Sequence, residues 1–437
     1  MKGLILTYLI TLAGSIAALR FPLIGLQVYV GFAVLRPQAI FGWAGDISNV
    51  SLIVGLAMLI GWSLDGFGSW RFGRARPVVV ALMLFAGWFV LSATQAIHTE
   101  GAFLAVEQFA KTVLPFLVGA TMLREKTHWR WMLWTIVLAQ GYVAFEMNFD
   151  YLVKARNTAA DGFGGMDNNF LGLGMVTVIG PAVALAIASR NWLQRLLASA
   201  AAVLILHTIL LTFSRGAMVG LLAVAVAAFV IMPKRPKYMA AVLLTVLLAV
   251  RLTGPQLLER YRSTFASEEE RDGSSESRIE LWRDCYKVIK EYPVLGVGPW
   301  NWSVVAASYG WPAGKSAHSV WMETAAETGV PGVVFLLLFF GIAATRLWPI
   351  ARARSTDANR EEVAFANGII LGIVGFGVSG QFVSAANLEL AYYVTMVGVA
   401  MLKESTRETA DVSVAGHVTV PPLTFQPSYG QSLRNPY

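Results

Sequence analysis

Apolar runs close to the length of a membrane-spanning helix cover most of the chain. Such a helix needs about 20 apolar residues at about 1.5 Å rise each, and runs of this kind, bounded by charge or by Gly, Pro, Asn or Asp, recur from end to end. The candidate segments are 4–19, 21–42, 47–64, 77–97, 103–123, 130–147, 170–189, 196–213, 216–232, 238–252, 330–349, 363–383 and 386–402. The first two are separated only by Arg20, so they form either two spans or one span and an interfacial helix. The pattern predicts an all-α polytopic membrane protein of about twelve transmembrane helices.

The composition agrees with this pattern. Of the 437 residues, 56% are hydrophobic and 14% are charged, whereas soluble domains have about 45–50% apolar and about 25% charged residues. A water-soluble fold is therefore excluded, and we expect the lipid bilayer to surround the chain. Cys285 is the only cysteine, which excludes a disulfide scaffold within the chain.

Basic residues set the expected topology. The net charge is +7, but many basic residues fall in alternate short loops, a pattern that serves membrane orientation and not a nucleic-acid partner. They are Arg71, Arg74, Arg76, Arg124, Lys126, Arg130, Arg190, Arg195, Lys234, Arg235, Lys237, Arg352, Arg354 and Arg360. With these loops in the cytoplasm, the expected organisation is N-terminal transmembrane helices (1–252), a large external loop (253–329), C-terminal transmembrane helices (330–402) and a disordered cytoplasmic tail (403–437).

Residues 196–232 form an apolar run that is too long for one span. As a single helix the run would extend roughly 55 Å, against a hydrocarbon core of about 30 Å. The chain must therefore fold back, and Arg215, followed by Gly216, is the only charge inside the run. An arginine at a tight external turn is typical of a functional site, and the alternative is a side chain that only extends to the membrane interface.

The external loop contains a predicted amphipathic helix at 277–289. Its apolar residues recur at three- and four-residue spacing, at Ile279, Trp282, Tyr286 and Ile289. Ser275 or Ser277 can cap its start, which places Arg278 in the first turn. A cation there opposes the helix dipole, so the position suits an arginine that meets an anion beside the exposed amides. The alternative is an ordinary surface arginine.

The last part of the loop carries the remaining candidate chemistry. His318 lies just before the helix that enters the next span, and a lone histidine is either a hydrogen-bonded structural residue or a catalyst. Glu323 and Glu327 are one helical turn apart and share a face. The glycines of 293–299 are too few for a phosphate-binding loop and indicate a tightly packed turn.

The sequence has no metal-binding signature. It contains neither HExxH nor CxxC, and its histidines are scattered, so we expect no metal and no cofactor. Asp46 and Asp167 are the carboxylates to consider if a metal is required. Asp167 otherwise fits the start of the helix at 170–189 as a cap.

Three motifs follow one another on the predicted external side. They are Ser214-Arg215-Gly216-Ala217, then Arg278-x-x-Leu281-Trp282 with the turn Pro293-x-Leu295-Gly296-Val297-Gly298, then His318-Ser319 with Glu327-Thr328-Gly329. Together they resemble the O-antigen ligase family of bacterial membrane glycosyltransferases. The resemblance covers about 196–350, and the rest of the chain resembles the family only as a series of spans.

The resemblance implies a metal-independent enzyme of C-type glycosyltransferase architecture in the bacterial inner membrane, with its active site facing the periplasm. Such an enzyme takes a glycan from undecaprenyl diphosphate and passes it to a hydroxyl, on a lipid A-core sugar in the ligases. Relatives polymerise lipid-linked repeats or glycosylate proteins. The diphosphate-binding arginines of the family correspond to Arg215 and Arg278, and its essential histidine corresponds to His318. Glu323 or Glu327 is the alternative base.

A transporter is the alternative from a different class. Many permeases have about twelve spans, and an arginine inside the membrane can balance a charged substrate. Transport sites lie near the bilayer midplane, however, whereas the polar residues of this chain gather in one external loop. Internal symmetry between the two halves would favour a transporter, and a membrane scaffold without chemistry is the third interpretation.

Overall fold

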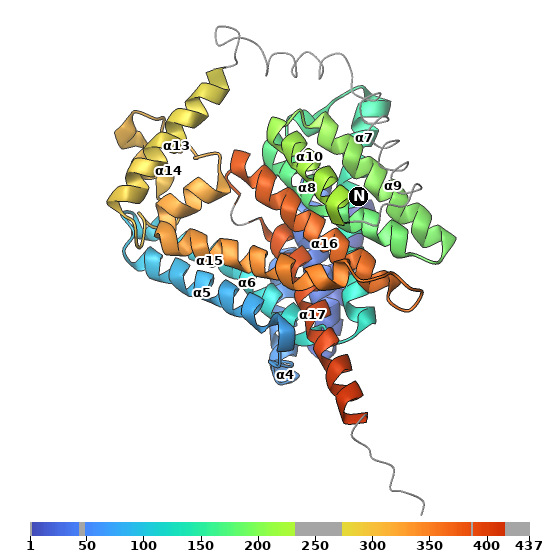
Figure 1. The fold of residues 1–437 in the computed structure, drawn as a ribbon. Coiled ribbons are helices and arrows are strands. Elements are labelled where there is room, and N and C mark those ends of the chain that lie inside the picture. Colours follow the sequence, from blue (N-terminus) through green and yellow to red (C-terminus); the bar gives the residue numbers. More distant parts are fainter. Residues whose placement is uncertain (1, 43–48, 232–272, 386–387, 416–437) are drawn as a thin grey trace, which may run out of the picture.

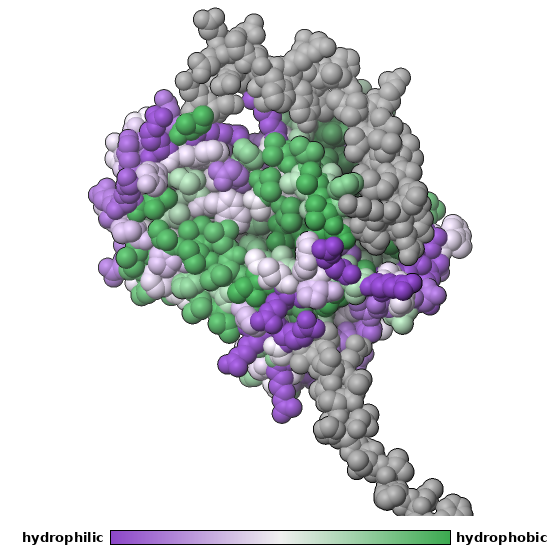
Figure 2. All heavy atoms as spheres, in the orientation of Figure 1, coloured by the Kyte–Doolittle hydropathy of each residue, from purple (hydrophilic) through white to green (hydrophobic). Residues whose placement is uncertain are grey.

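The computed structural model describes residues 2–42, 49–231, 273–385 and 388–415. Within these ranges every regular element is a helix, and seven helices are long and apolar enough to cross a membrane. They are α1 (Lys2–Arg20), α5 (Arg76–Thr94), α6 (Thr99–Met122), α8 (Asn168–Ala188), α9 (Trp192–Leu211), α15 (Val320–Ala351) and α16 (Arg360–Ser379). The chain is an all-α polytopic membrane protein. Its apolar side chains form a broad band across the molecule, with hydrophilic side chains gathered beyond the band (Figure 2).

Three further apolar helices are shorter, and the others carry more charge or lie in loops. The shorter ones are α2 (Pro22–Leu35), α4 (Val50–Leu64) and α10 (Arg215–Ile231). The others are α3 (Pro37–Phe41), α7 (Lys126–Lys154), α13 (Gly273–Glu291), α14 (Trp302–Val305) and α17 (Glu389–Ala415). Each predicted segment inside the described ranges contains a helix, and the predicted span 238–252 lies outside them.

The predicted segment 21–42 is two helices and not one. α2 ends at Leu35, and α3 begins at Pro37. Between them Arg36 adopts a left-handed backbone with φ 49°, and a residue before proline is disfavoured in the right-handed helical region. The break turns the chain at one end of the bundle and fixes the position of the Arg36 side chain.

α8 and α16 form the centre of the bundle. They approach closely because glycine faces glycine: a Cβ at Gly180 would lie 2.7 Å from the Gly368 carbonyl oxygen, and one at Gly368 would lie 2.9 Å from the Gly180 oxygen. Small residues at such crossings let two backbones pack closely within a membrane. α10 packs against both helices, and α9 packs against α7 and α8.

The described part of the predicted external loop, from residue 273 on, folds into a small helical unit beyond the ends of α5 and α15 (Figure 1). Its buried cluster consists of Leu281, Cys285, Val288, Val297, Trp302, Ala306, Ala317 and Ala326. The amphipathic helix is present as α13, and of the four apolar residues at helical spacing Trp282 and Ile289 pack against this cluster. Ile279 and Tyr286 are 57% and 53% exposed, because Trp302 and Ala326 pack against the neighbouring face of the helix.

The boundary predicted for the C-terminal tail is too early. α17 continues to Ala415, and Lys403, the first residue of the expected tail, is 4% exposed. Its ammonium group donates to the carbonyl oxygens of Ser69, Ala120 and Thr121 at 2.8 to 3.1 Å. Two of these carbonyls belong to the last turn of α6. Lys403, which the sequence pattern assigned to a solvated tail, therefore caps this helix.

Candidate active site

The apolar run 196–232 turns back where the sequence predicted, in the three residues between α9 and α10. The Ser214 hydroxyl accepts a hydrogen bond from the Ala217 amide at 3.2 Å and donates one to Asn169 Oδ1 at 2.8 Å. The first contact caps α10, and the second attaches the turn to the start of α8. Arg215 is therefore the first residue of a capped helix, and its side chain is half-buried.

Phe382 connects the Arg215 turn with the helix that carries Arg278. A Cβ at Gly216 would lie 2.6 Å from the Phe382 Cβ, so the start of α10 packs directly on this residue. On its other side the Phe382 ring lies 6.5 Å from the Trp282 ring, measured between centroids. Trp282 is one turn after Arg278 on α13. The two arginine-bearing helices thus meet over one phenylalanine from the turn after α16.

Arg278 does not lie in the first turn of its helix, as the sequence had predicted. α13 begins at Gly273, so Ser275 and Ser277 lie inside the helix and not at its start. Glycine and serine are weak helix formers, which is why the sequence pattern placed the start later. The helix dipole therefore does not account for the position of Arg278. Its role has to be inferred from the residues that lie near it.

His318 is held in an unusual backbone conformation. Its φ is 51°, a left-handed value that a non-glycine residue adopts only when the surroundings impose it. The residue before it is fixed on both sides: the Ala317 amide donates to Glu323 Oε2 at 2.8 Å, and the Trp282 indole donates to the Ala317 carbonyl at 3.0 Å. The residue after it, Ser319, caps α15. The imidazole is half-buried.

The three predicted site residues act on one another electrostatically. Burial and then Arg215 lower the pKa of Arg278. Burial, then Arg278 and Lys315, lower the pKa of His318. Asp167 opposes both shifts, so its carboxylate belongs to the same cluster. The lowered pKa makes His318 a neutral imidazole at pH 7, which is able to accept a proton.

Among the residues that the structure describes, the guanidinium groups of Arg215 and Arg278 lie in one cluster with the carboxylate of Asp167. One oxygen of Asp167 is already engaged, because its Oδ1 accepts from the Phe170 amide at 2.8 Å and caps α8 as predicted. Over the described ranges, neither the Arg278 guanidinium nor the His318 ring makes a hydrogen bond or an ion pair. Half-buried like charges of this kind are stabilised by an anion, and guanidinium groups suit phosphate oxygens.

Residues 200–337 match the family described as O-antigen ligase. This range contains Arg215, Arg278 and His318, and it agrees with the part of the chain that carries the three motifs. The chain contains an O-antigen ligase domain. The match covers about a third of the chain, and proteins of the matched family are glycosyltransferase-like enzymes. Residues 1–155 match a family of unknown function (DUF5935), and no curated protein matches the chain.

The ligase domain includes a break in α15. Gly329 has φ 71° and ψ −179°, and Pro331 lacks the amide that would continue the helix. The carbonyls released by the break bind the turn at 293–299, for example Ala326, which accepts from the Val297 amide at 3.0 Å. A Cβ at Gly329 would lie 2.1 Å from the Val294 oxygen. The tightly packed turn expected from the glycines is confirmed, and it packs on this break.

Glu327 attaches the same turn through its side chain and its main chain. The carboxylate is 8% exposed and accepts from the backbone amides of Trp300 and Trp302. Its carbonyl oxygen accepts from the Gly298 amide and the Ser92 hydroxyl, both at 2.9 Å. Through these contacts Glu327 holds the turn at 293–299 against α15 inside the ligase domain.

Sequence reasoning missed two residues that support the site. Phe382 and Ser384 lie outside the matched range, in the chain between α16 and α17, and the Ser384 hydroxyl donates to Glu323 Oε2. The sequence indicates Asp167 only as a helix cap or, if a metal is required, as a metal ligand. No spacing in the sequence indicates these contacts, because they arise where α16 ends and α8 begins beside the ligase domain.

Proposed function

We propose that this protein is an O-antigen ligase that transfers a glycan from undecaprenyl diphosphate to an acceptor hydroxyl of a lipid A-core sugar, on the periplasmic side of the inner membrane and without a metal ion. The observation that carries the proposal is the cluster of Arg215, Arg278 and His318. Their order in the chain matches the family motifs, and their chemistry suits a diphosphate leaving group beside a neutral base.

In the proposed reaction the two guanidinium groups bind the diphosphate of the donor. The bond between the anomeric carbon and the diphosphate oxygen breaks, and the electron pair stays on that oxygen, where Arg215 and Arg278 stabilise the charge. The acceptor oxygen forms the new bond to the anomeric carbon, and its proton passes to His318. The products are the glycosylated acceptor and undecaprenyl diphosphate, and His318 then releases its proton to water.

The proposed architecture follows the family. About twelve spans form a C-type glycosyltransferase fold, with 1–252 and 330–402 as the membrane parts, and 253–329 as the periplasmic loop. The α9–α10 turn then faces the periplasm together with this loop. The short basic loops face the cytoplasm, as the positive-inside rule requires.

The test is donor binding and glycan transfer by purified full-length variants. Arg215→Lys and Arg278→Lys should lose roughly ten- to a hundredfold in rate, because each loses a charge-assisted contact of roughly 1.5–3 kcal/mol while keeping its charge. Arg283→Lys, on the exposed side of α13, is the matched control. His318→Gln should bind the donor and lose about 10²–10⁴ in transfer. Parent rates for both lysine variants would reject the proposed diphosphate site.

The acceptor is tested separately in a deletion strain complemented with each variant. Mass analysis of surface glycolipids and glycoproteins should show lipid A core without its polymeric glycan. Lipid A core that carries a single repeat would indicate a polymerase instead, and loss of glycan from proteins alone would indicate a protein O-oligosaccharyltransferase.

A further inference from the structure

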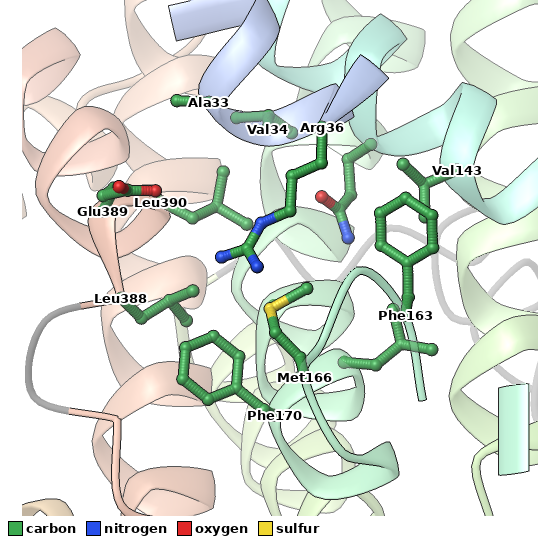
Figure 3. Close-up of a pocket in the computed structure, with 13 residues that line it drawn as sticks. Ala33, Val34, Arg36, Val143, Phe163, Met166, Phe170, Leu388, Glu389 and Leu390 are labelled. Carbon is green, nitrogen blue, oxygen red and sulfur yellow. The ribbon is translucent and has the colours of Figure 1, made fainter. Parts of the chain in front are cut away.

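A pocket with two charged residues in its walls lies against the segment 163–170, which also carries Asp167 (Figure 3). Met166 and Phe170 line the pocket, whereas Asp167 between them acts on Arg278 and His318. The other walls come from α2, α7 and the start of α17. The pocket therefore shares a short stretch of backbone with the site but none of its three proposed residues.

Two opposite charges face each other in this pocket. The Arg36 guanidinium extends from the break between α2 and α3 and lies between Glu389 and Phe163 (Figure 3). One of its nitrogens, Nη1, donates to the Gly164 carbonyl at 3.0 Å. Arg36 and Glu389 attract each other through space, yet in the part of the chain with described positions no direct ion pair joins them. Donors of Arg36 and acceptors of Glu389 thus remain for a ligand.

The size and the walls of the pocket restrict the ligand. The free space between the lining side chains equals about two water molecules, so a substituent enters and a whole sugar ring does not. Phe163, Met166 and Phe170 supply an apolar wall. The negative charge of Glu389 would repel a phosphate or a carboxylate, and the positive charge of Arg36 would repel an ammonium group. A neutral group fits if it has one acceptor for Arg36, one donor for Glu389 and a small apolar end for the apolar wall.

We propose that this pocket is a saccharide subsite that takes the acetamido group of an N-acetylated sugar. The amide oxygen accepts from Arg36, the amide N–H donates to Glu389, and the methyl group contacts the apolar wall. The proposal rests on the proposed glycan transfer, because the sugar belongs either to the lipid-linked donor or to the acceptor. The remainder of the sugar then lies at the mouth of the pocket.

The test uses full-length protein in detergent and two matched pairs of probes. The donor pair is undecaprenyl diphosphate linked to N-acetylglucosamine or to glucose, and the acceptor pair is the methyl glycoside of each sugar. One pair should show preference for the acetylated sugar, and that pair identifies the source. Glu389→Gln should reduce the preference roughly tenfold, since the hydrogen bond from the sugar amide loses the charge of its acceptor. Arg36→Lys should reduce it as well, and Glu107→Gln, on the exposed face of α6, should not.

Undecaprenyl diphosphate without sugar is the control that separates the two proposals. Glu389→Gln and Arg36→Lys should bind it like the parent, which also shows that they fold. If the parent binds it but discriminates neither pair, or if Glu389→Gln keeps the full preference, the saccharide subsite is wrong and the proposed transfer stands. If the parent binds neither this lipid nor its glycosylated forms, the proposed function itself fails. Displacement of the acetylated probe by phosphatidylethanolamine vesicles from the parent, but not from Glu389→Gln, would assign the pocket to a lipid headgroup and overturn the proposal.

Discussion

The Ala317 amide donates to Glu323 Oε2 at 2.8 Å, so the first turn of α15 fixes the peptide that precedes His318. The Ser384 hydroxyl donates to the same oxygen. Glu323 therefore connects the proposed base with the chain between α16 and α17. This contact gives the carboxylate a positioning role, and it makes the competing assignment of Glu323 as the base testable.

Glu323→Gln and Glu323→Ala should differ. The glutamine oxygen can still accept from the Ala317 amide, so we expect most of the transfer rate to remain, whereas the alanine variant loses the contact and should lose at least tenfold. A base would be lost in both variants, with a deficit of about 10²–10⁴. Single-turnover transfer at saturating donor measures this difference, and equal deficits in the two variants would favour Glu323 as the base. Glu327→Gln is measured beside them, and a larger loss there than in His318→Gln would move the assignment to Glu327.

The pH dependence of kcat/KM should report His318 in the free enzyme. Because the pKa of His318 is lowered below 6.5 by burial, Arg278 and Lys315, the neutral base predominates at pH 7, and activity should fall only on acidification below that value. Asp167→Asn keeps a good helix cap and removes the charge that raises this pKa, so the acidic limb should move to lower pH. Lys315→Gln should move it to higher pH. The same acidic limb in the parent, Asp167→Asn and Lys315→Gln would contradict the assignment of His318.

Transfer should proceed in chelator at an undiminished rate, because we assign the leaving-group charge to Arg215 and Arg278 and not to a cation. The measurement is initial rate with and without EDTA, followed by addition of Mg²⁺ or Mn²⁺. Loss of activity in EDTA with recovery on adding a metal would require carboxylate ligands. Asp167 and Asp46 would then be the first to replace, of which Asp46 lies outside the described ranges.

How far the sequence predicted the structure depended on the kind of contact. The turn at Arg215 was predictable because a run of that length cannot cross a bilayer once. The buried face of α13 was not, because apolar residues occupy two faces and only the partner surface decides whether Tyr286 or Cys285 is inside. Asp167 joins the site because α8 packs on the α10 turn, where a Cβ at Gly172 would lie 2.7 Å from Ala217, and no spacing along the chain indicates that contact.

Topology can be tested with two cysteines that replace serine almost isosterically. Ser308→Cys in the loop should react with an impermeant maleimide in intact cells, and Ser355→Cys after α15 should react only after permeabilisation. Native Cys285 can stay, because it is fully buried and burial raises the pKa of its thiol, which keeps it unreactive. Labelling of Ser355→Cys from outside would invert the proposed orientation.

Two truncations that differ by two residues should show how much Lys403 and Glu404 contribute to thermal stability. A chain that stops after Glu404 keeps the Lys403 ammonium on α6 and the Glu404 carboxylate, which accepts from the Trp129 indole at 2.7 Å. A chain that stops after Leu402 loses both and should melt several degrees lower, since hydrogen bonds to charged groups contribute roughly 1.5–3 kcal/mol. Thermal unfolding in detergent measures this, and equal melting temperatures would show that Lys403 contributes little.

The break at Gly329 has a consequence for engineering chimeras between relatives. The turn at 293–299 is hydrogen-bonded to carbonyls that α15 exposes there, and Val330 donates back to the Pro293 carbonyl at 2.8 Å. A loop exchanged alone would arrive without its complementary backbone and would leave the host helix with unsatisfied buried carbonyls at the break. The smallest segment that can be exchanged intact between relatives therefore runs from α13 through Pro331 and includes the first third of α15.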